Sequence, residues 1–234
     1  MAVELKVLCA RSMTAAVNAL ADDFSRESGR RVDITFGTVG ALQAQLAAGA
    51  TADVLILGAP AIAQMERAGE VVLGSRKDIA RTSIGVAVRE GVAAPDVATP
   101  EAFKRALTAA RTVAFSDPAV GGSAGVHLAQ LWVRMGMGDE IARKGMPQKN
   151  GGEVAARVAD GKADIGLTLV AEIVPIKGAR VIGKLPAPFG NDTTYAAAIS
   201  ASCADRAAAA AFIAALLRPA GRDVWTAAGF DWLG

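Results

Sequence analysis

Small and hydroxyl-bearing residues recur where predicted helices begin. They lie at Ser12 and within residues 38–40, 121–125 and 150–152. The first backbone N–H groups of a helix have no partner inside the helix and lie at the positive end of its dipole, so they can donate hydrogen bonds to an anion. Small side chains let that anion approach the main chain closely. The pattern indicates a site for a small anion, although each segment alone also fits an ordinary cap or turn.

Arg11 adds a cation beside the first of these segments. It lies between a predicted strand and Ser12, and in parallel-sheet proteins this position faces the ligand crevice. A guanidinium binds a carboxylate through two parallel hydrogen bonds. Arg11 is therefore a candidate carboxylate ligand. The alternative is an exposed arginine that pairs with a nearby acidic side chain.

The sequence offers little for metal or nucleophilic chemistry. His127 is the single histidine, and Cys9 and Cys203 are the two cysteines, so we expect no metal site and no cofactor. We interpret both cysteines as small core residues, with a disulfide between them left open. His127 is predicted on the polar face of a helix, where it is either solvated or placed to contact a ligand or transfer a proton.

Composition and charge exclude other classes of partner. The chain has 234 residues, 25 Lys and Arg against 23 Asp and Glu, and a net charge of +2. It has no basic block or stripe, so nucleic acid is not expected as a partner. It also lacks a run of about 18 uncharged apolar residues, so we expect at most a peripheral association with a membrane. The first residues do not resemble a secretory signal, which predicts a cytoplasmic protein or one whose leader has been removed.

Short apolar runs rich in β-forming residues alternate with longer stretches of helical period. This alternation is typical of parallel β-α-β units and predicts the α/β class. A new series of elements begins at Thr82, and no polar linker separates the two halves of the chain. The predicted strands are residues 5–9, 32–36, 53–57, 83–88, 112–116, 164–169, 180–185 and 193–199.

Several segments, in this order and spacing, resemble the type II solute-binding proteins of ABC transporters, specifically the molybdate-binding branch. The resemblance covers essentially the whole chain and rests on residues 7–13, 36–42, 49–54, 116–118 with 124–125, 161–166 and 228–230. It implies a two-lobed periplasmic-binding-protein type II fold in which each lobe is a mostly parallel sheet flanked by helices. We expect lobe 1 to comprise residues 1–81 plus 196–234 and lobe 2 to comprise residues 82–195. The ligand would then lie in the cleft between the lobes, with the two crossing segments as hinge.

The resemblance also implies which residues hold the ligand. Molybdate binders use neutral donors, namely two serines at helix starts, amides of two loops in the second lobe, and a tyrosine hydroxyl. These positions fall in turn on Ser12; on Thr38, Val39 and Gly40; on Ser123, Ala124 and Gly151; and near Leu169. A leucine cannot donate a hydrogen bond, and Arg11 stands where the family has a small residue. These departures favour a larger or carboxylate-bearing anion over molybdate.

The function implied is capture of a small anion for an ABC transporter. The ligand expected is a molybdate- or tungstate-type oxyanion or a small carboxylate, the partner is the transporter permease, and the protein is expected to be a periplasmic monomer. One alternative is an isomerase of a small polycarboxylate, similar to the aconitate isomerases of this superfamily, with His127 or a carboxylate as the base. The other is a cytoplasmic ligand sensor on the same fold. A binding protein without enzymatic activity is favoured.

Overall fold

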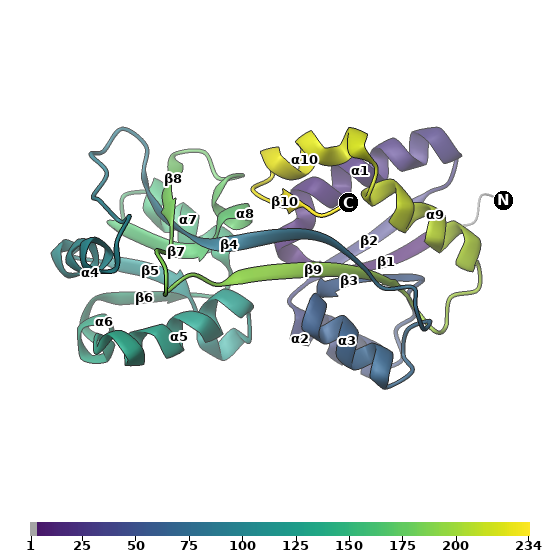
Figure 1. The fold of residues 1–234 in the computed structure, drawn as a ribbon, viewed down its shortest axis with the longest axis horizontal. Helices are drawn as coiled ribbons and strands as arrows, with labels where there is room; N and C mark the ends of the chain where they lie inside the picture. Colours follow the sequence, from purple (N-terminus) through teal and green to yellow (C-terminus); the bar gives the residue numbers. More distant parts are fainter. Residues whose placement is uncertain (1–3) are drawn as a thin grey trace. The chain divides into compact units, whose positions relative to one another are not determined.

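The computed structural model describes residues 4–234 and has a mixed α/β fold (Figure 1). The chain forms two compact units, which are Met1–Arg81 with Thr193–Gly234 (unit 1) and Thr82–Asp192 (unit 2). It passes from unit 1 to unit 2 within strand β4 and returns within strand β9. The α/β class predicted from the alternation of strands and helices is confirmed.

The sheet of unit 1 has the order β2-β1-β3-β9. Strand β1 runs parallel to both β2 and β3, whereas β9 is antiparallel to β3 and β10 is antiparallel to β4. Because β1, β2 and β3 are parallel, their carboxyl ends meet at one edge of the sheet. The strands are β1 (Leu5–Ala10), β2 (Val32–Gly37), β3 (Val54–Gly58), β4 (Lys77–Arg89), β9 (Asp192–Ile199) and β10 (Asp231–Trp232).

Helices cover both faces of this sheet (Figure 1). On one face, α2 and α3 pack over alternate strand residues such as Leu8 and Leu55. On the other, α1 packs against α9, with the rings of Phe24 and Phe212 5.3 Å apart. Strand residues alternate between faces, so nearly continuous apolar strands supply two cores. The helices of unit 1 are η1 (Arg11–Met13), α1 (Thr14–Ser28), α2 (Val39–Ala47), α3 (Ala59–Arg67), α9 (Arg206–Leu216), η3 (Pro219–Gly221) and α10 (Arg222–Ala227).

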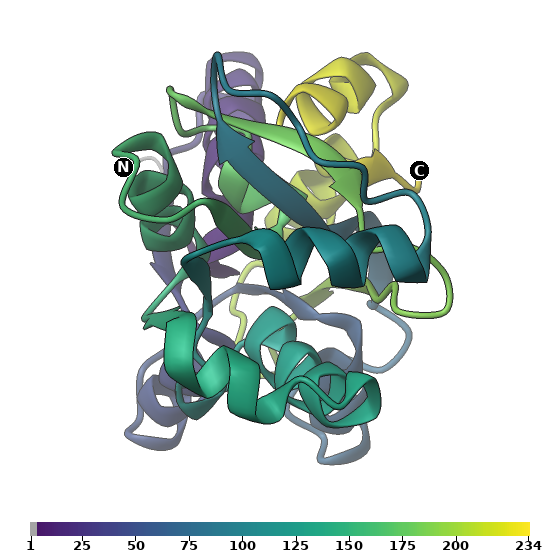
Figure 2. The same cartoon turned by 90° about the vertical axis from the view of Figure 1, so that its left-hand side faces the viewer.

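Unit 2 repeats this plan with the strand order β4-β7-β5-β6, and β8 also pairs with β4. Strand β5 is parallel to β6 and β7, and β4 is antiparallel to β7 and β8. These strands are β5 (Val113–Ser116), β6 (Gly145–Gln148), β7 (Ile165–Leu169) and β8 (Ala179–Lys184). The helices are α4 (Pro100–Ala109), η2 (Pro118–Val120), α5 (Ser123–Met135), α6 (Gly138–Lys144), α7 (Gly151–Ala159) and α8 (Val170–Ile173). Figure 2 views this unit end-on, with α4 crossing in front of its strands.

Side-chain caps fix where several helices begin. The side chains of Thr38, Thr99, Asn150 and Asp205 each accept a hydrogen bond from the main-chain N–H three residues later, at the starts of α2, α4, α7 and α9. Such caps satisfy N–H groups that the helix itself leaves unpaired. Within residues 4–234, no helix combines the length and apolar character that crossing a membrane requires.

Candidate functional site

Ser12 and Tyr195 form a hydroxyl pair at the carboxyl end of β1. Ser12 lies in η1, directly after the strand, and its Oγ donates a hydrogen bond to Tyr195 Oη at 2.7 Å. Tyr195 lies in β9 opposite Gly58, the last residue of β3. The predicted role of Ser12 as an N-cap is wrong, because η1 has no side-chain cap and α1 begins at Thr14. The serine hydroxyl is engaged by a distant tyrosine instead.

Packing holds the tyrosine ring in place. Tyr195 is 4% exposed, and its ring lies edge-on to Phe230 with the centroids 6.0 Å apart. Phe230 in turn contacts the buried ring of Trp225. Aromatic rings packed edge to face have few alternative positions. The Tyr195 hydroxyl is therefore placed by the core rather than by surface contacts.

Arg11 and Thr38 lie at the same edge of the sheet as Ser12. The register pairs Ala10 with Gly37, so the residues that follow β1 and β2 are neighbours. The Arg11 side chain is exposed and makes no hydrogen bond or ion pair with any residue that the structure describes. Thr38 Oγ1 accepts from Ala41 N, which leaves the hydroxyl proton to be donated elsewhere. The structure thus places Arg11, Ser12 and Thr38 directly after two adjacent parallel strands of unit 1.

Val39 and Gly40 form the first turn of α2 beside Thr38. Val39 is half-buried, and Gly40 is exposed with no atom within 4 Å of the position that a Cβ would take. The main chain is therefore open at Gly40. Together, Arg11, Ser12, Thr38, Gly40 and Tyr195 are called here the unit 1 set.

The predicted residues of unit 2 lie where β5, β6 and β7 end. Ser123 is the exposed first residue of α5, Ala124 follows it and is buried, and Gly151 is the buried first residue of α7. Leu169 ends β7 and is 3% exposed, with a side chain that cannot donate a hydrogen bond. The unit 2 donors are therefore main-chain amides and the Ser123 hydroxyl.

A carboxylate of the protein lies at the start of α7. A Cβ on Gly151 would stand 2.0 Å from Glu172 Oε2 and 2.2 Å from Thr168 Oγ1, so both side chains pack directly on the glycine. Thr168 donates to Glu172 Oε2 at 2.7 Å. Because a threonine hydroxyl has one proton, Ser116 Oγ must be the donor in its 2.9 Å contact with Thr168. The hydrogen bonds from Ser116 to Thr168 and from Thr168 to Glu172 thus hold the Glu172 carboxylate at the positive end of the α7 dipole.

Sequence reasoning missed Glu172 as a site residue, and it indicated Tyr195 only as the end of residues 191–195, a stretch that flanks the inserted region and could form part of a hinge or cleft. Tyr195 is the single tyrosine in the chain, which is a weak signal on its own. Glu172 gave no such signal, because Thr168 lies in β7 and Glu172 in α8, so their spacing of four residues is not that of neighbours on one helix. No local pattern connects Tyr195 to Ser12 or Glu172 to Gly151, because both contacts arise from the order of strands in the sheets.

His127 and the cysteines take structural positions. His127 Nε2 lies 2.8 Å from the carbonyl oxygen of Phe189, and since a carbonyl only accepts, this nitrogen carries the proton. Cys9 and Cys203 are free and buried. Burial raises the pKa of the Cys9 thiol far above its ordinary value. Burial, followed by a hydrogen bond to Asp53, raises the pKa of Cys203 to about 11. At neutral pH both remain thiols, which are poor nucleophiles.

Metal ligands are not gathered in the part of the chain that the structure describes. Residues 4–234 contain no group of three or more His, Cys, Asp or Glu side chains arranged as a metal site would need. The unit 1 set offers hydrogen-bond donors and a guanidinium, which suit an anion.

Solved structures of similar fold include oxyanion-binding proteins. The substrate-binding domain of a putative molybdenum ABC transporter from Clostridium difficile has a TM-score of 0.80 and 20% identity, with 100% of both chains covered. The periplasmic molybdate-binding protein of Azotobacter vinelandii has a TM-score of 0.79 and 24% identity, with 98% of this chain and 100% of that chain covered. At these identities the likeness concerns the fold, which is that of two-lobed periplasmic binding proteins.

Comparison of the amino-acid sequence with known proteins identifies a similar enzyme and a matching family. An aconitate isomerase from a Pseudomonas species is 29% identical over 203 residues, which are 83% of this chain and 75% of that protein. The model of the bacterial extracellular solute-binding protein family matches residues 5–231. The match spans nearly the whole chain, and it agrees with the resemblance to type II solute-binding proteins noted from the sequence. This chain is a member of the bacterial extracellular solute-binding protein family.

Proposed function

We propose that this protein captures a small anion for an ABC transporter and that the unit 1 set binds the negative charge of that anion. The observation that carries the proposal is the hydrogen bond from Ser12 Oγ to Tyr195 Oη. A hydroxyl that accepts a hydrogen bond becomes a stronger donor, because hydrogen bonds in a chain polarise one another. In this proposal Tyr195 supplies the tyrosine hydroxyl that the family resemblance places near Leu169.

The guanidinium of Arg11 selects the ligand class that we propose, a small di- or tricarboxylate. Arg11 is exposed beside Ser12 and has no partner among residues 4–234. A planar guanidinium matches the two oxygens of a carboxylate, and such charge-assisted pairs are about twice as strong as neutral hydrogen bonds. The similarity to a protein named for an action on aconitate, a tricarboxylate, supports the same choice.

Unit 2 supplies further donors in this proposal. The amides at the start of α5, near Ser123 and Ala124, donate to the ligand, and the helix dipole favours negative charge there. At the start of α7 the Glu172 carboxylate already packs on Gly151, so this helix start is not proposed as a donor to the anion. Units 1 and 2 are then the two lobes of the binding protein, and the segments within β4 and β9 that join them act as its hinge. We further propose a location outside the cytoplasm and docking to the transporter permease, as the family description supports. A monomeric state is part of the same proposal.

A panel of thermal unfolding measurements tests the ligand class. The purified protein is heated alone and with molybdate, tungstate, sulfate, phosphate, citrate, aconitate, malate or succinate. An anion at a hundred times its Kd adds about 2.7 kcal/mol to the free energy of unfolding, which raises Tm by roughly 5–11 °C for a chain of this size. We expect a shift with at least one carboxylate. A shift with molybdate and tungstate alone would contradict the carboxylate proposal, and no shift with any anion would contradict the binding function.

Isomerisation of a polycarboxylate is the second candidate function, and Glu172 favours it. Its carboxylate is oriented by Thr168 against the start of α7, and a proton-transferring enzyme needs a base held in one position. Such a base removes a proton from one carbon of the substrate, and a proton returns to another carbon. His127 is the weaker candidate, because its Nε2 proton is already donated to Phe189.

Proton NMR of cis-aconitate incubated with the enzyme tests this alternative. Appearance of trans-aconitate, lost in Glu172→Gln while binding is retained, would establish an isomerase. A constant spectrum at high protein concentration would rule this reaction out.

A further inference from the structure

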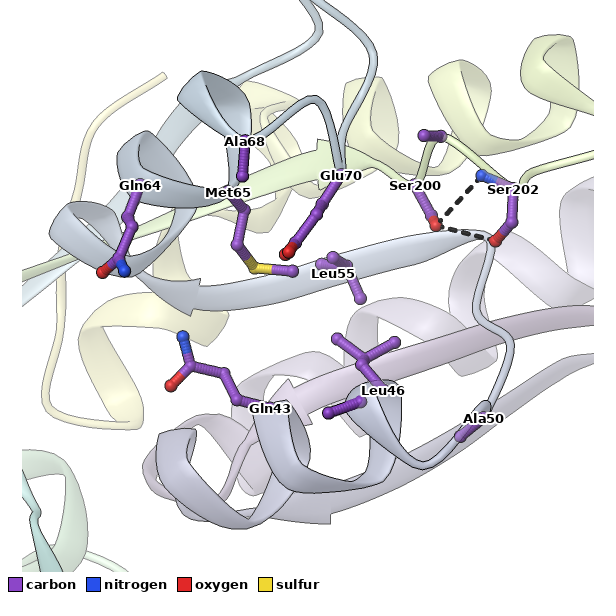
Figure 3. Close-up of a pocket in the computed structure, with 12 residues that line it drawn as sticks. Gln43, Leu46, Ala50, Leu55, Gln64, Met65, Ala68, Glu70, Ser200 and Ser202 are labelled. Atoms are coloured by element: carbon purple, nitrogen blue, oxygen red, sulfur yellow. Dashed lines mark hydrogen bonds between the residues drawn. The ribbon is translucent and has the colours of Figure 1, made fainter.

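A groove in unit 1 lies between α2 and α3, over strand β3 (Figure 3). Its volume is about 450 Å³, within the range of small-molecule sites. It lies toward the carboxyl ends of α2 and α3, whereas Thr38 and the rest of the unit 1 set lie at the start of α2. Helix α2 has nine residues, so its rise of 1.5 Å per residue separates its two ends by about 13 Å. The groove is therefore distinct from the proposed anion site.

The floor of the groove is apolar and well packed. Leu55 is 1% exposed, Met65 is 3% exposed, and both belong to the core beneath α2 and α3. The walls carry alanines, namely Ala47, Ala50, Ala68 and Ala201. These short side chains leave open a space that larger apolar residues would fill. Methionine adapts its shape to what it contacts, so Met65 suits a floor against which a ligand packs.

Polar groups stand around this floor. Gln43 and Gln64 face each other across one end of the groove, and Ser200 and Ser202 lie at the other end, with their hydroxyl oxygens 3.0 Å apart (Figure 3). The Glu70 side chain reaches over the floor between them, toward Met65. An apolar surface with a few converging polar groups is the usual composition of a ligand site.

Glu70 sets the charge of the groove. It is the one charged side chain among the lining residues that the structure describes. Its carboxylate has no hydrogen bond or ion pair to any other residue within 4–234. Lys and Arg are missing from the described lining, so an anion would meet a like charge there. An ammonium group would meet a carboxylate and the amide oxygens of two glutamines, all of which accept hydrogen bonds.

We propose that this groove is a second ligand site, which takes a primary ammonium group carried on a compact apolar body. The ammonium binds Glu70 and the amide oxygen of Gln43 or Gln64, and the apolar body packs on Leu55 and Met65. The ligand of this site is thus opposite in charge to the anion proposed for the unit 1 set. The two sites bind independently.

NMR of the full-length protein labelled with [methyl-¹³C]methionine tests this site. The Met65 signal is identified through Met65→Leu, and benzylammonium chloride is titrated, with sodium benzoate as a probe of equal size and opposite charge. We expect a saturating shift of the Met65 methyl signal with benzylammonium and none with benzoate. Adding the anion that binds the unit 1 set should leave this titration unchanged.

Substitutions test separately whether binding needs the charge of Glu70 and the open space beside Ala68. Glu70→Gln should raise the Kd for benzylammonium at least about fivefold. Glu66→Gln is the matched control, because Glu66, near the end of α3, lies four residues before Glu70 but accepts from Gly74 N and does not line the groove, and it should leave the Kd unchanged. Ala68→Leu fills the space and should abolish the shift without lowering Tm. No saturating shift in the unmodified protein, an equal shift with benzoate, or an unchanged Kd in Glu70→Gln would each overturn the proposal.

Discussion

The hydroxyl of Ser12 donates to the hydroxyl of Tyr195 across 2.7 Å, although the two residues are 183 positions apart in the chain. One follows the first strand of unit 1, and the other lies in the strand by which the chain returns to that unit. Both residues must therefore be placed by the sheet before Tyr195, polarised by Ser12, can donate to a ligand. In the proposed site they act as one group.

Removing either hydroxyl should weaken anion binding. Ser12→Ala and Tyr195→Phe should each raise the Kd about tenfold or more, which is about 1.4 kcal/mol. Tyr195→Phe removes the donor to the charged ligand, and Ser12→Ala removes the hydrogen bond that strengthens this donor. In Ser12→Ala/Tyr195→Phe the loss should be smaller than the sum of the single losses, since the two hydroxyls are coupled. Isothermal titration calorimetry of the four proteins measures the cycle. Strictly additive losses would show that the residues act separately.

Arg11 should distinguish carboxylates from tetrahedral oxyanions. Arg11→Ala should raise the Kd for a carboxylate ligand by tenfold or more, and Arg11→Lys should recover part of this loss, because lysine keeps the charge but not the paired geometry. Any affinity for molybdate should change much less. Calorimetric titration of the three proteins with both ligands checks this, and equal losses for carboxylate and molybdate would contradict a selective role.

Gly151 should not tolerate a side chain. In Gly151→Ala the new Cβ would meet Glu172 Oε2 at 2.0 Å and Thr168 Oγ1 at 2.2 Å, so the carboxylate or the helix must move. We expect a loss of about 1–3 kcal/mol in the free energy of unfolding, typical of overpacking. Gly152→Ala is the control, because its Cβ would approach only Asn150 Oδ1, at 3.3 Å. Urea unfolding compares the two, and equal stability of the variants would show that Glu172 moves aside without cost.

Asp164 should make the stability of unit 2 depend on pH. The side chain of Arg111 and main-chain N–H groups donate to its carboxylate and hold its pKa below the ordinary value, against a smaller opposing effect of burial. A carboxyl group whose pKa is lower in the folded state stabilises the fold above its unfolded pKa of about 3.9, and this stabilisation is lost as the pH falls through the folded value. Asp164→Asn should therefore be less stable than the unmodified protein at pH 7, and the difference should shrink below about pH 4. Urea unfolding at pH 7 and pH 3 measures it, and a difference that stays constant would contradict this origin.

The sequence predicted much of the fold because its signals are local. Apolar runs such as residues 53–57 are buried strands, and Gly29, with φ of 69°, ends α1 in the left-handed conformation that glycine adopts readily. Strands β6 and β10 were not predicted. β6 contains Pro147 and glycine, and β10 has only two residues, so neither has the pattern of a strand.

The candidate site was less predictable, because its contacts connect distant segments. Ser12 fits the sequence pattern of a cap. Nothing near it in the sequence indicates that a tyrosine on a distant strand accepts the hydrogen bond from its hydroxyl. Likewise, Gly151 and the asparagine before it signal an open helix start, whereas the carboxylate that fills the space beside Gly151 comes from α8. The order of the strands in the sheets determines both contacts, and the sequence alone does not fix that order.

A crystal structure with the anion that gives the largest thermal shift tests the central claim most directly. The account predicts an anion oxygen within about 3.2 Å of Tyr195 Oη, which still accepts from Ser12 Oγ, with the Arg11 guanidinium on a carboxylate of the ligand. An anion bound at a place that none of these three residues reaches would contradict the proposed site.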